Sequence, residues 1–208
     1  MASGTDRRER ISDAVLDIVD ADGIRALTHR AVDRHLELPA GSTSYYFRTK
    51  RELLVAAAAH LTEISRRDFR SSRLAPPPPD ATPPITRIAA DIGAALDATL
   101  ADRARDLRVR CALMLEMMHD KEIQQSLSTS IFSRELATDL VRALGSSDPE
   151  VDGGNFVALC EGLVWESSVG MRAITGPAPG TTASRRLLTA AVATYLSGVV
   201  ARAGEAVR

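Results

Sequence analysis

Hydroxyl, tyrosine and basic side chains gather in one stretch of the sequence, residues 27–54, around a short polar turn. Such side chains can donate hydrogen bonds to the phosphates and base edges of DNA. Thr28 precedes one short helical pattern, and Ser42 to Tyr46 would form a second one after a turn in which Pro39 can occupy the first helical position. Two short helices joined by a tight turn are typical of a helix-turn-helix, whose second helix enters the major groove. The stretch therefore predicts binding of duplex DNA rather than catalysis.

The residue pattern of the first short helix predicts one buried face and one face exposed to solvent. Its apolar residues recur at helical spacing, so this face is expected to pack inward, as is Phe47 after the second helix. The polar residues between them are expected on the outer surface. The inward set is Leu27, Ala31, Val32 and Leu36, and the outward set is His29, Arg30, Asp33 and Arg34.

The next helix begins with a capping pattern. Thr49 can serve as the N-cap while Glu52 reaches back to the helix start, as in a capping box. Lys50 then lies in the first helical turn, where a cation is unfavourable for the helix dipole. A DNA phosphate explains a lysine at this place better than local helix stability does.

In order, the threonine, the turn, the paired tyrosines, the phenylalanine, the lysine and the leucines of residues 27–54 resemble the N-terminal domain of TetR-family transcriptional regulators. The resemblance covers about the first third of the chain and rests on spacing, caps and residue types together. It implies an all-α fold with a helix-turn-helix domain. It also implies phosphate contacts by Thr28, Tyr45, Tyr46 and Lys50, and a base-facing surface of Arg30, Ala40, Gly41, Ser42 and Ser44.

Two residues depart from the family pattern. Glu37 stands in the turn where the family usually has glycine, so backbone strain or repulsion of a nearby phosphate is expected there. Ser44 replaces a frequent aromatic residue on the second helix. The base preference therefore does not follow by analogy with the family.

Composition and charge predict a cytoplasmic chain with a local DNA-binding face. The 208 residues are 45% hydrophobic and 25% charged, with a formal net charge of −1, which suits one sizeable core or two small ones. Residues 25–51 nevertheless hold six basic and two acidic side chains, and the local charge is what a phosphate meets. No apolar run approaches the length of a membrane span, and the polar start is unlike a signal peptide. The preference for arginine over lysine indicates a GC-rich bacterial genome.

Helical periodicity continues through the rest of the chain with one clear interruption. The proline-rich segment 76–84 favours an extended conformation and predicts a boundary rather than a docking motif. We therefore expect a helix-turn-helix domain over residues 1–50, a connecting helix over 50–73, and a helical effector-binding and dimerisation domain over 74–208. Helices are expected at about 6–21, 85–101, 104–119, 121–144, 149–174 and 183–203.

A methionine-rich cluster in the second domain is the candidate site for a small-molecule effector. Methionine adapts to varied apolar ligands, whereas a methionine stripe at helical spacing more often fills a core, and both alternatives stay open here. Glu116 and His119 are further polar groups that could face a cavity. The predicted ligand-binding residues are Arg110, Cys111, Met114, Met117, Met118, Phe132, Glu161 and Trp165.

Catalytic and metal sites are not expected. Glu116 and His119 have the ExxH spacing of di-iron helical bundles, but the sequence has no second copy of it, and such bundles require one. HExxH, Walker and GxGxxG motifs are also absent from the sequence. Cys111 and Cys160 are expected to be reduced and buried, and a redox switch lacks a CxxC spacing. We predict no enzyme activity, no metal and no cofactor.

Two apolar stripes near the C-terminus predict either a dimer interface or a protomer core. Two such helices from each of two chains would form a four-helix bundle. A dimer would also suit a palindromic site, and the family resemblance implies dimerisation. The stripes are Phe156, Leu159, Cys160, Leu163, Val164 and Val169, and Leu188, Ala191, Val192, Tyr195, Val199 and Val200.

These patterns together predict a homodimeric repressor that a small molecule releases from a palindromic DNA operator, with no role at a membrane. Two alternatives remain at this stage. One is a helical ligand-binding protein whose DNA binding is vestigial and sequence-blind. The other is a ligand-independent DNA-binding factor whose methionine cluster is solid core.

Overall fold

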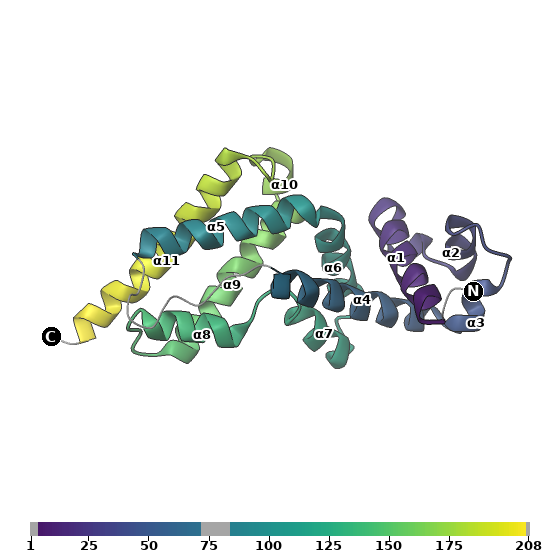
Figure 1. Ribbon diagram of the computed structural model, residues 1–208, viewed down its shortest axis with the longest axis horizontal. Coiled ribbons are helices and arrows are strands. Elements are labelled where there is room, and N and C mark those ends of the chain that lie inside the picture. Colours follow the sequence, from purple (N-terminus) through teal and green to yellow (C-terminus); the bar gives the residue numbers. More distant parts are fainter. Residues whose placement is uncertain (1–3, 72–83, 207–208) are drawn as a thin grey trace. The chain divides into compact units, whose positions relative to one another are not determined.

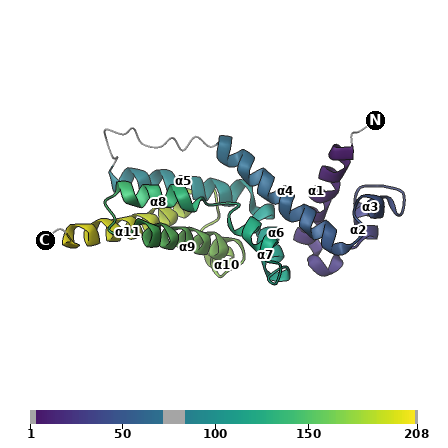
Figure 2. The same cartoon turned by 90° about the horizontal axis from the view of Figure 1, so that it is seen from below.

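The computed structural model describes residues 4–71 and 84–206 (Figures 1 and 2). The chain is 80% helical, and no strand occurs in the described part. This confirms the predicted all-α class. The chain divides into two compact units, each assembled from two segments of the sequence. Unit 1 comprises residues 1–72 and 105–131, and unit 2 comprises residues 73–104 and 132–208.

Unit 1 combines the N-terminal helices with two helices from the middle of the chain. One apolar core joins them: Val15 and Leu53 contribute from the N-terminal segment, and Leu113 and Leu127 contribute from the middle segment, all four fully buried. In both views α1, α2 and α3 cluster together (Figures 1 and 2). The helices of unit 1 are α1 (Gly4–Asp22), η1 (Ile24–Ala26), α2 (His29–His35), α3 (Ser42–Tyr46), α4 (Lys50–Ser71), α6 (Ala104–Glu116) and α7 (Lys121–Ser128).

Unit 2 is built on two close helix pairs, α5 with α11 and α8 with α9. Each pair meets at a glycine. A Cβ atom on Gly93 would lie 2.8 Å from the Cα of Thr189, and one on Gly153 would lie 2.7 Å from the Cα of Thr138, so a larger residue would push the helices apart. The helices are α5 (Ile85–Asp102), α8 (Arg134–Ala143), α9 (Pro149–Ser168), α10 (Arg172–Thr175) and α11 (Thr182–Ala206).

Two of the long helices expected from periodicity are each divided in the structure. The segment expected over 121–144 breaks after Ser128, and α8 begins at Arg134. Its N-cap is Ser133, whose hydroxyl accepts a hydrogen bond from Leu136 N at 3.2 Å. The segment expected over 149–174 likewise ends as α9 at Ser168, before the short α10. Apolar periodicity continued across both breaks and concealed the caps. Most of the proline-rich segment lies outside the described residues, and Pro84 is the N-cap of α5.

The apolar character of α11 corrects another expectation. Residues Thr182–Gly204 are long and apolar enough to cross a membrane by length and composition, with a mean hydropathy of 1.3. One such helix is weak evidence, because a core helix of a soluble protein meets the same criterion. Only 22% of the 18-residue apolar window within this helix is buried inside the fold of the single chain.

Both cysteines are buried and neither forms a disulfide, as the sequence predicted. Cys111 lies in α6 of unit 1, and Cys160 lies in α9 of unit 2. Burial, assisted by the neighbouring carboxylate of Glu161, raises the pKa of the Cys160 thiol to about 12. A thiol of this kind stays protonated near neutral pH and is a poor nucleophile.

Candidate nucleic-acid interface

The helix-turn-helix forms from α2, a tight turn and α3. Thr28 caps α2, since its hydroxyl accepts a hydrogen bond from Ala31 N at 3.1 Å. After α2, Leu38 N donates to Asp33 O at 2.8 Å and Glu37 N donates to Arg34 O at 3.2 Å. This pair of bonds is the Schellman arrangement, which requires a left-handed residue directly after the C-cap.

Glu37 is that left-handed residue. Its φ is +54°, and among the described residues it is the sole non-glycine with a positive φ. An L-residue pays roughly 1–2 kcal/mol to adopt this conformation, which is why glycine is favoured at this position. The strain expected from the family comparison is therefore present in the backbone.

Helix α3 does not begin at Pro39, although proline could have occupied the first helical position. Its first residue is Ser42 and its N-cap is Gly41, with φ +90°. Pro39 belongs to the preceding turn, where its carbonyl accepts hydrogen bonds from Ser42 N at 3.1 Å and Ser42 Oγ at 2.6 Å. The helix itself, Ser42–Tyr46, agrees with the predicted span.

One side of α3 is exposed and the other is packed against the core. Tyr45 is 83% exposed, whereas Phe47 turns inward as predicted and is 5% exposed. The Tyr45 and Tyr46 rings lie edge to face, with centroids 5.2 Å apart. Of the residues predicted to meet DNA, Thr28, Arg30, Ala40, Gly41, Ser44 and Tyr45 are exposed, and Ser42, Tyr46 and Lys50 are half-buried.

Asp33 was expected on the outer surface, and this expectation is wrong. It is 4% exposed, and both carboxylate oxygens accept hydrogen bonds from the start of α3. Oδ2 accepts from Gly41 N at 2.8 Å, and Oδ1 accepts from Thr43 N at 2.8 Å and Thr43 Oγ1 at 2.6 Å. Burial alone raises the pKa of Asp33, but these hydrogen bonds outweigh it and hold the pKa below the usual value. No local sequence pattern indicated this contact, because the donors meet Asp33 only through the turn.

The start of α4 carries the predicted cap. Glu52 N donates to Thr49 Oγ1 at 3.1 Å, and the Glu52 side chain reaches back to Arg48 N at 2.7 Å, one residue earlier than in a standard capping box. Lys50 Nζ donates to Ile24 O at 2.6 Å, which ties α4 to η1. An ammonium group has three N–H donors, so the phosphate role of Lys50 stays a prediction alongside this bond.

Comparison with known families decides the identity of the chain. A family model described as "Tetracyclin repressor-like, C-terminal domain" matches residues 83–202, more than half of the sequence. The chain belongs to the TetR family of transcriptional regulators. A search of curated proteins finds no significant match.

Solved TetR-like structures share the fold over nearly the whole length. A transcriptional regulator from Rhodococcus sp. Rha1 is 17% identical with a TM-score of 0.69, over 93% of this chain and 96% of that one. A TetR-family member from Streptomyces coelicolor A3 is 23% identical with a TM-score of 0.65, over 89% and 97%. The multidrug binding protein EbrR in complex with ethidium is 22% identical with a TM-score of 0.63, over 89% and 98%. These likenesses support the fold, an N-terminal helix-turn-helix followed by a helical domain.

In this TetR-family chain, the residues predicted to bind an effector are divided between the two units. Met114 and Met117 pack against the core of unit 1, while Met118 is 60% exposed. Arg110 is buried, and its guanidinium donates to Leu127 O at 2.8 and 3.0 Å and to Ser130 Oγ at 3.2 Å. Unit 1 holds Arg110, Cys111, Met114, Met117 and Met118, and unit 2 holds Phe132, Glu161 and Trp165.

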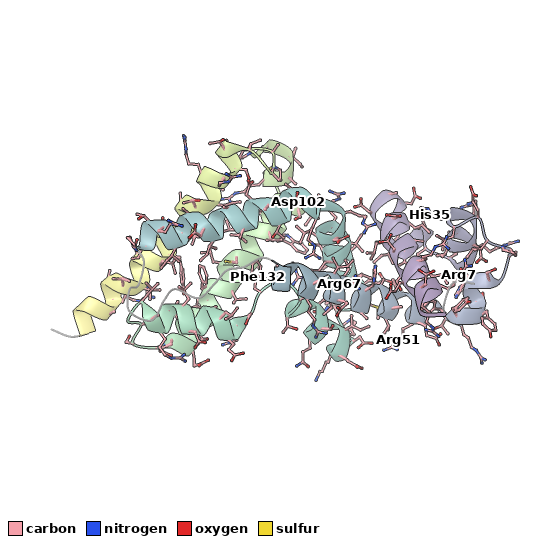
Figure 3. The ribbon with its side chains drawn as sticks, in the orientation of Figure 1. Arg7, His35, Arg51, Arg67, Asp102 and Phe132 are labelled. Atoms are coloured by element: carbon pink, nitrogen blue, oxygen red, sulfur yellow. The ribbon has the colours of Figure 1, made fainter. Side chains whose placement is uncertain are left out.

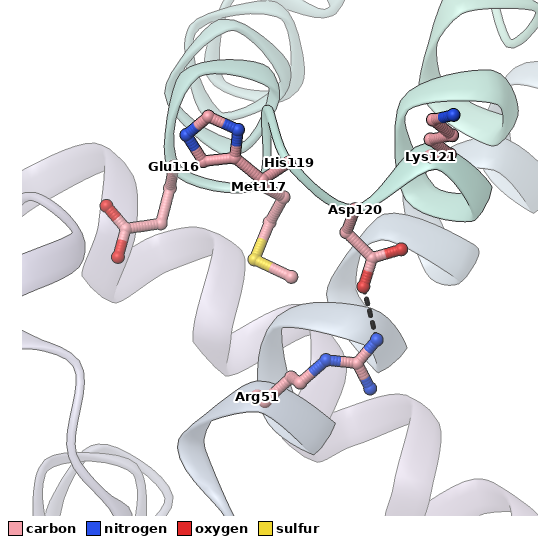
Figure 4. A pocket seen from close by; sticks show the side chains of 6 residues that line it. All are labelled: Arg51, Glu116, Met117, His119, Asp120 and Lys121. Carbon is pink, nitrogen blue, oxygen red and sulfur yellow. Dashed lines mark hydrogen bonds and ion pairs between the residues drawn. The ribbon is translucent and has the colours of Figure 1, made fainter.

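An open pocket of about 430 Å³ lies in unit 1 where α4 begins and α6 ends. Arg51 of α4 pairs with Asp120 across it (Figure 4). The pairing lowers the pKa of Asp120, which also caps α7 by accepting from Ile123 N at 3.3 Å. The polar groups on this surface are thus partly engaged with one another. The remaining lining residues are Glu116, Met117, His119 and Lys121.

A row of ion pairs joins α1 to α6, and we call it the α1–α6 ladder. Arg105 donates to Asp17 at 2.6 Å and to Asp13 at 3.0 Å. Arg108 donates to both carboxylate oxygens of Asp20, at 2.7 and 2.8 Å. The Asp20 hydrogen bonds raise the pKa of Arg108. The ladder connects α6 directly to the first helix of the DNA-binding region.

Two histidines flank the ladder. His35, at the end of α2 (Figure 3), lies 3.3 Å from an Asp17 oxygen. His60 of α4 lies 3.8 Å from an Asp13 oxygen. The acidic face of α1 therefore contacts α2, α4 and α6. Through these contacts it links α2, the first helix of the helix-turn-helix, to the rest of unit 1.

Proposed function

We propose that this TetR-family regulator is a cytoplasmic repressor that binds a palindromic operator as a homodimer and leaves it when a small molecule binds. The observation that carries the proposal is α3, a short helix packed on one side and presenting Ser44 and Tyr45 to solvent on the other. Regulators of this family are generally non-enzymatic DNA-binding proteins, and we propose no catalytic role. Residues 1–50 would bind DNA, 50–73 would connect, and 74–208 would bind the effector and dimerise.

The proposed DNA contacts follow from side-chain chemistry. Arginine can form a bidentate pair with guanine, and small residues allow close approach to base edges. We propose that Thr28, Tyr45, Tyr46 and Lys50 contact phosphates and that Arg30, Ala40, Gly41, Ser42 and Ser44 face bases. Phosphate contacts position the protein without reading sequence, so the two groups should differ on random DNA.

Apart from Val169, the proposed dimer uses different residues of α9 and α11 from those first expected. Most of the two predicted apolar stripes is buried within one protomer; Phe156, Leu163, Leu188 and Val192 are each at most 6% exposed. The buried members of these stripes therefore form core of unit 2, which was the alternative left open by the sequence, whereas Val169 of the first stripe is exposed.

A second face of α9 is apolar or small, and it is exposed. Its residues recur at intervals of three, four or seven, as on one side of a helix. Trp165 is 39% exposed and Val169 is 44% exposed, and Trp165 is also in the predicted effector set. On α11, small residues such as Ala190, Ser197 and Ala201 are likewise exposed. We give the name α9 outer face to four residues of the helix and its C-cap residue, and we propose that this face packs against a second copy. The four are Val151, Ala158, Gly162 and Trp165, and the C-cap residue is Val169.

The proposed effector is a small apolar molecule that contacts α6. EbrR has been solved in complex with ethidium. Met114 of α6, together with Met117 and Met118 directly after the helix, offers adaptable apolar contacts. A shift of α6 would reach the reading helices through the α1–α6 ladder and through the Arg51–Asp120 pair. Release requires that the effector bind more tightly to the conformation with the wrong half-site spacing.

Selection of bound fragments from the source genome tests the proposed function. We expect enrichment of promoter fragments that share a palindrome, and lower transcription from such a promoter in a purified system when the protein is added. Enrichment without any shared sequence would contradict operator recognition. Activation of transcription would contradict the repressor assignment while leaving DNA recognition intact.

A further inference from the structure

Helix α3, the second helix of the helix-turn-helix, is too short to be stable without contacts from other elements. It has five residues, and its N-cap Gly41 has no side chain to accept hydrogen bonds from the first helical amides. Helices of this length are not stable in isolation, since nucleation is unfavourable. Contacts from other elements must therefore fix the direction in which α3 presents its exposed side chains.

At its N-terminal end, α3 is held by the buried carboxylate of Asp33. The two Asp33 oxygens together accept hydrogen bonds from Gly41 N, Thr43 N and Thr43 Oγ1, at 2.6 to 2.8 Å. Thr43 is fully buried, so neither member of this pair can touch DNA in this conformation. A negative charge at a helix start also suits the helix dipole.

At its C-terminal end, α3 is held by two cationic or polar side chains from other helices. His29 Nε2 of α2 is 2.7 Å from Phe47 O and donates to it. Arg8 of α1 donates to Tyr46 O at 3.0 Å, and its guanidinium lies 4.7 Å from the centre of the Phe47 ring. These bonds satisfy carbonyl groups that a helix end leaves without partners.

We propose that the Asp33–Thr43 pair, assisted by His29 and Arg8, is a positioning device that sets the DNA specificity of α3 without touching DNA. This inference rests on the proposed function. Base contacts depend on direction, whereas phosphate contacts are tolerant of small shifts. Loosening α3 should therefore reduce binding to the preferred site far more than binding to random duplex.

The test compares three single variants of the full-length protein. Thr43→Ser retains the hydroxyl donor, Thr43→Val removes it with almost no change of shape, and Asp33→Asn places an amide donor against a backbone N–H. The probes are the duplex best enriched by wild-type protein and a random duplex of equal length. Circular dichroism checks the fold, and amide hydrogen exchange follows Gly41 and Thr43, with Leu53 as an internal reference.

We expect wild-type behaviour for Thr43→Ser. We expect roughly 10-fold weaker binding of the selected duplex by Thr43→Val and up to roughly 100-fold by Asp33→Asn, the scale of one or two lost base contacts. Binding to random duplex should change less than about twofold, as expected if phosphate contacts persist. Exchange should accelerate at Gly41 and Thr43 and not at Leu53.

Equal losses on selected and random duplex, or selected binding unchanged in Thr43→Val and Asp33→Asn, would overturn the inference. If Asp33→Asn fails to fold, the Thr43→Val and Thr43→Ser pair decides the question. If wild-type protein enriches no duplex, the proposed function fails instead. In that case faster amide exchange at Gly41 and Thr43 in Thr43→Val and Asp33→Asn than in wild type would still support the positioning of α3. Unchanged exchange in these variants would overturn it.

Discussion

Two exposed helix faces of this protein, one on α3 and one on α9, differ in chemistry. The α3 face presents hydroxyl groups and a tyrosine, with arginines on neighbouring segments. The α9 outer face presents valines, small residues and Trp165. A polar, basic face suits a polyanion, whereas an apolar face suits a second apolar surface. The comparison indicates that DNA binding should depend strongly on salt and that dimerisation should not.

Gly162→Arg should produce the largest effect. A Cβ atom on Gly162 meets nothing within 4 Å, so the protomer can accept a side chain there, but two arginines would oppose each other in the proposed dimer. We expect a monomer in sedimentation equilibrium and a loss of operator affinity of roughly 100-fold, as expected when two linked half-sites no longer act together. Ala143→Arg, on the exposed surface of α8, is the matched control. A dimeric Gly162→Arg protein would place the interface elsewhere.

Arg30→Ala and Lys50→Ala should separate base reading from phosphate contact on the α3 side. Arg30→Ala should cost about 1–3 kcal/mol on the operator and relax the preference at one base pair. Lys50→Ala should weaken binding to all sequences about equally and reduce the salt slope by about 1. Competition titrations over a range of salt concentrations measure both. Equal loss on specific and random DNA for Arg30→Ala would move Arg30 to the phosphate group.

Glu37→Gly should stabilise the turn beneath α3. Glycine adopts the observed φ of +54° without a Cβ clash, so the free energy of unfolding should rise by about 1 kcal/mol. Glu37→Ala keeps the strain and serves as the control, since it removes the charge alone. Urea denaturation gives both values. A gain of the same size in Glu37→Ala would attribute the effect to charge rather than to backbone strain.

Removing the α1–α6 ladder should have a smaller effect that depends on salt. The double variant Arg105→Gln/Arg108→Gln removes partly exposed ion pairs, which contribute about 0.2–1 kcal/mol each at low salt. At about 1 M salt, where the screening length falls to 3 Å, variant and wild type should be equally stable. Arg87→Gln, which removes an ion pair within α5, is the control. A difference that persists at high salt would indicate a packing role.

The Asp33 carboxylate should make the stability of the protein depend on pH in the acidic range and not near neutral pH. Because its pKa is lowered in the folded state, the stabilisation that it provides is present above the ordinary aspartate value of 3.8 and is lost as pH falls below it. Protection of the Gly41 and Thr43 amides should follow the same dependence in wild type. In Asp33→Asn that dependence should disappear. An unchanged pH profile in Asp33→Asn would assign the transition to another group.

The sequence allowed the helix caps and the inward turn of Phe47 to be predicted better than the contacts that hold α3. Thr28, Thr49 and Phe47 behave as their local patterns indicated, and the strain at Glu37 was also expected. Asp33 was misplaced because a polar residue beside Val32 on a two-turn helix looks solvent-exposed by periodicity alone. Its donors at Gly41 and Thr43 come together through the turn, which no local pattern reveals.

In the C-terminal region, helices were predicted but their faces were not. The apolar residues of α9 and α11 with helical spacing proved to form the protomer core, because α5 and α8 cover them. The exposed row of small and apolar residues on α9 is weaker in hydrophobicity, so apart from Trp165 and Val169 its residues did not stand out in the sequence. The packing of helices within one protomer decides which apolar stripe stays exposed. Such packing is tertiary structure, which the spacing of residues along one helix does not reveal.

Hydroxyl-radical footprinting of the enriched duplex by wild-type protein tests the central claim most directly. Two copies of α3 that read half-sites through a symmetric dimer should give a twofold-symmetric footprint, with protected segments about one helical turn, roughly 34 Å, or a multiple of it apart. Gly162→Arg should lose this pattern, and Ala143→Arg should retain it. Uniform protection that ignores sequence and disappears with modest salt would contradict the account.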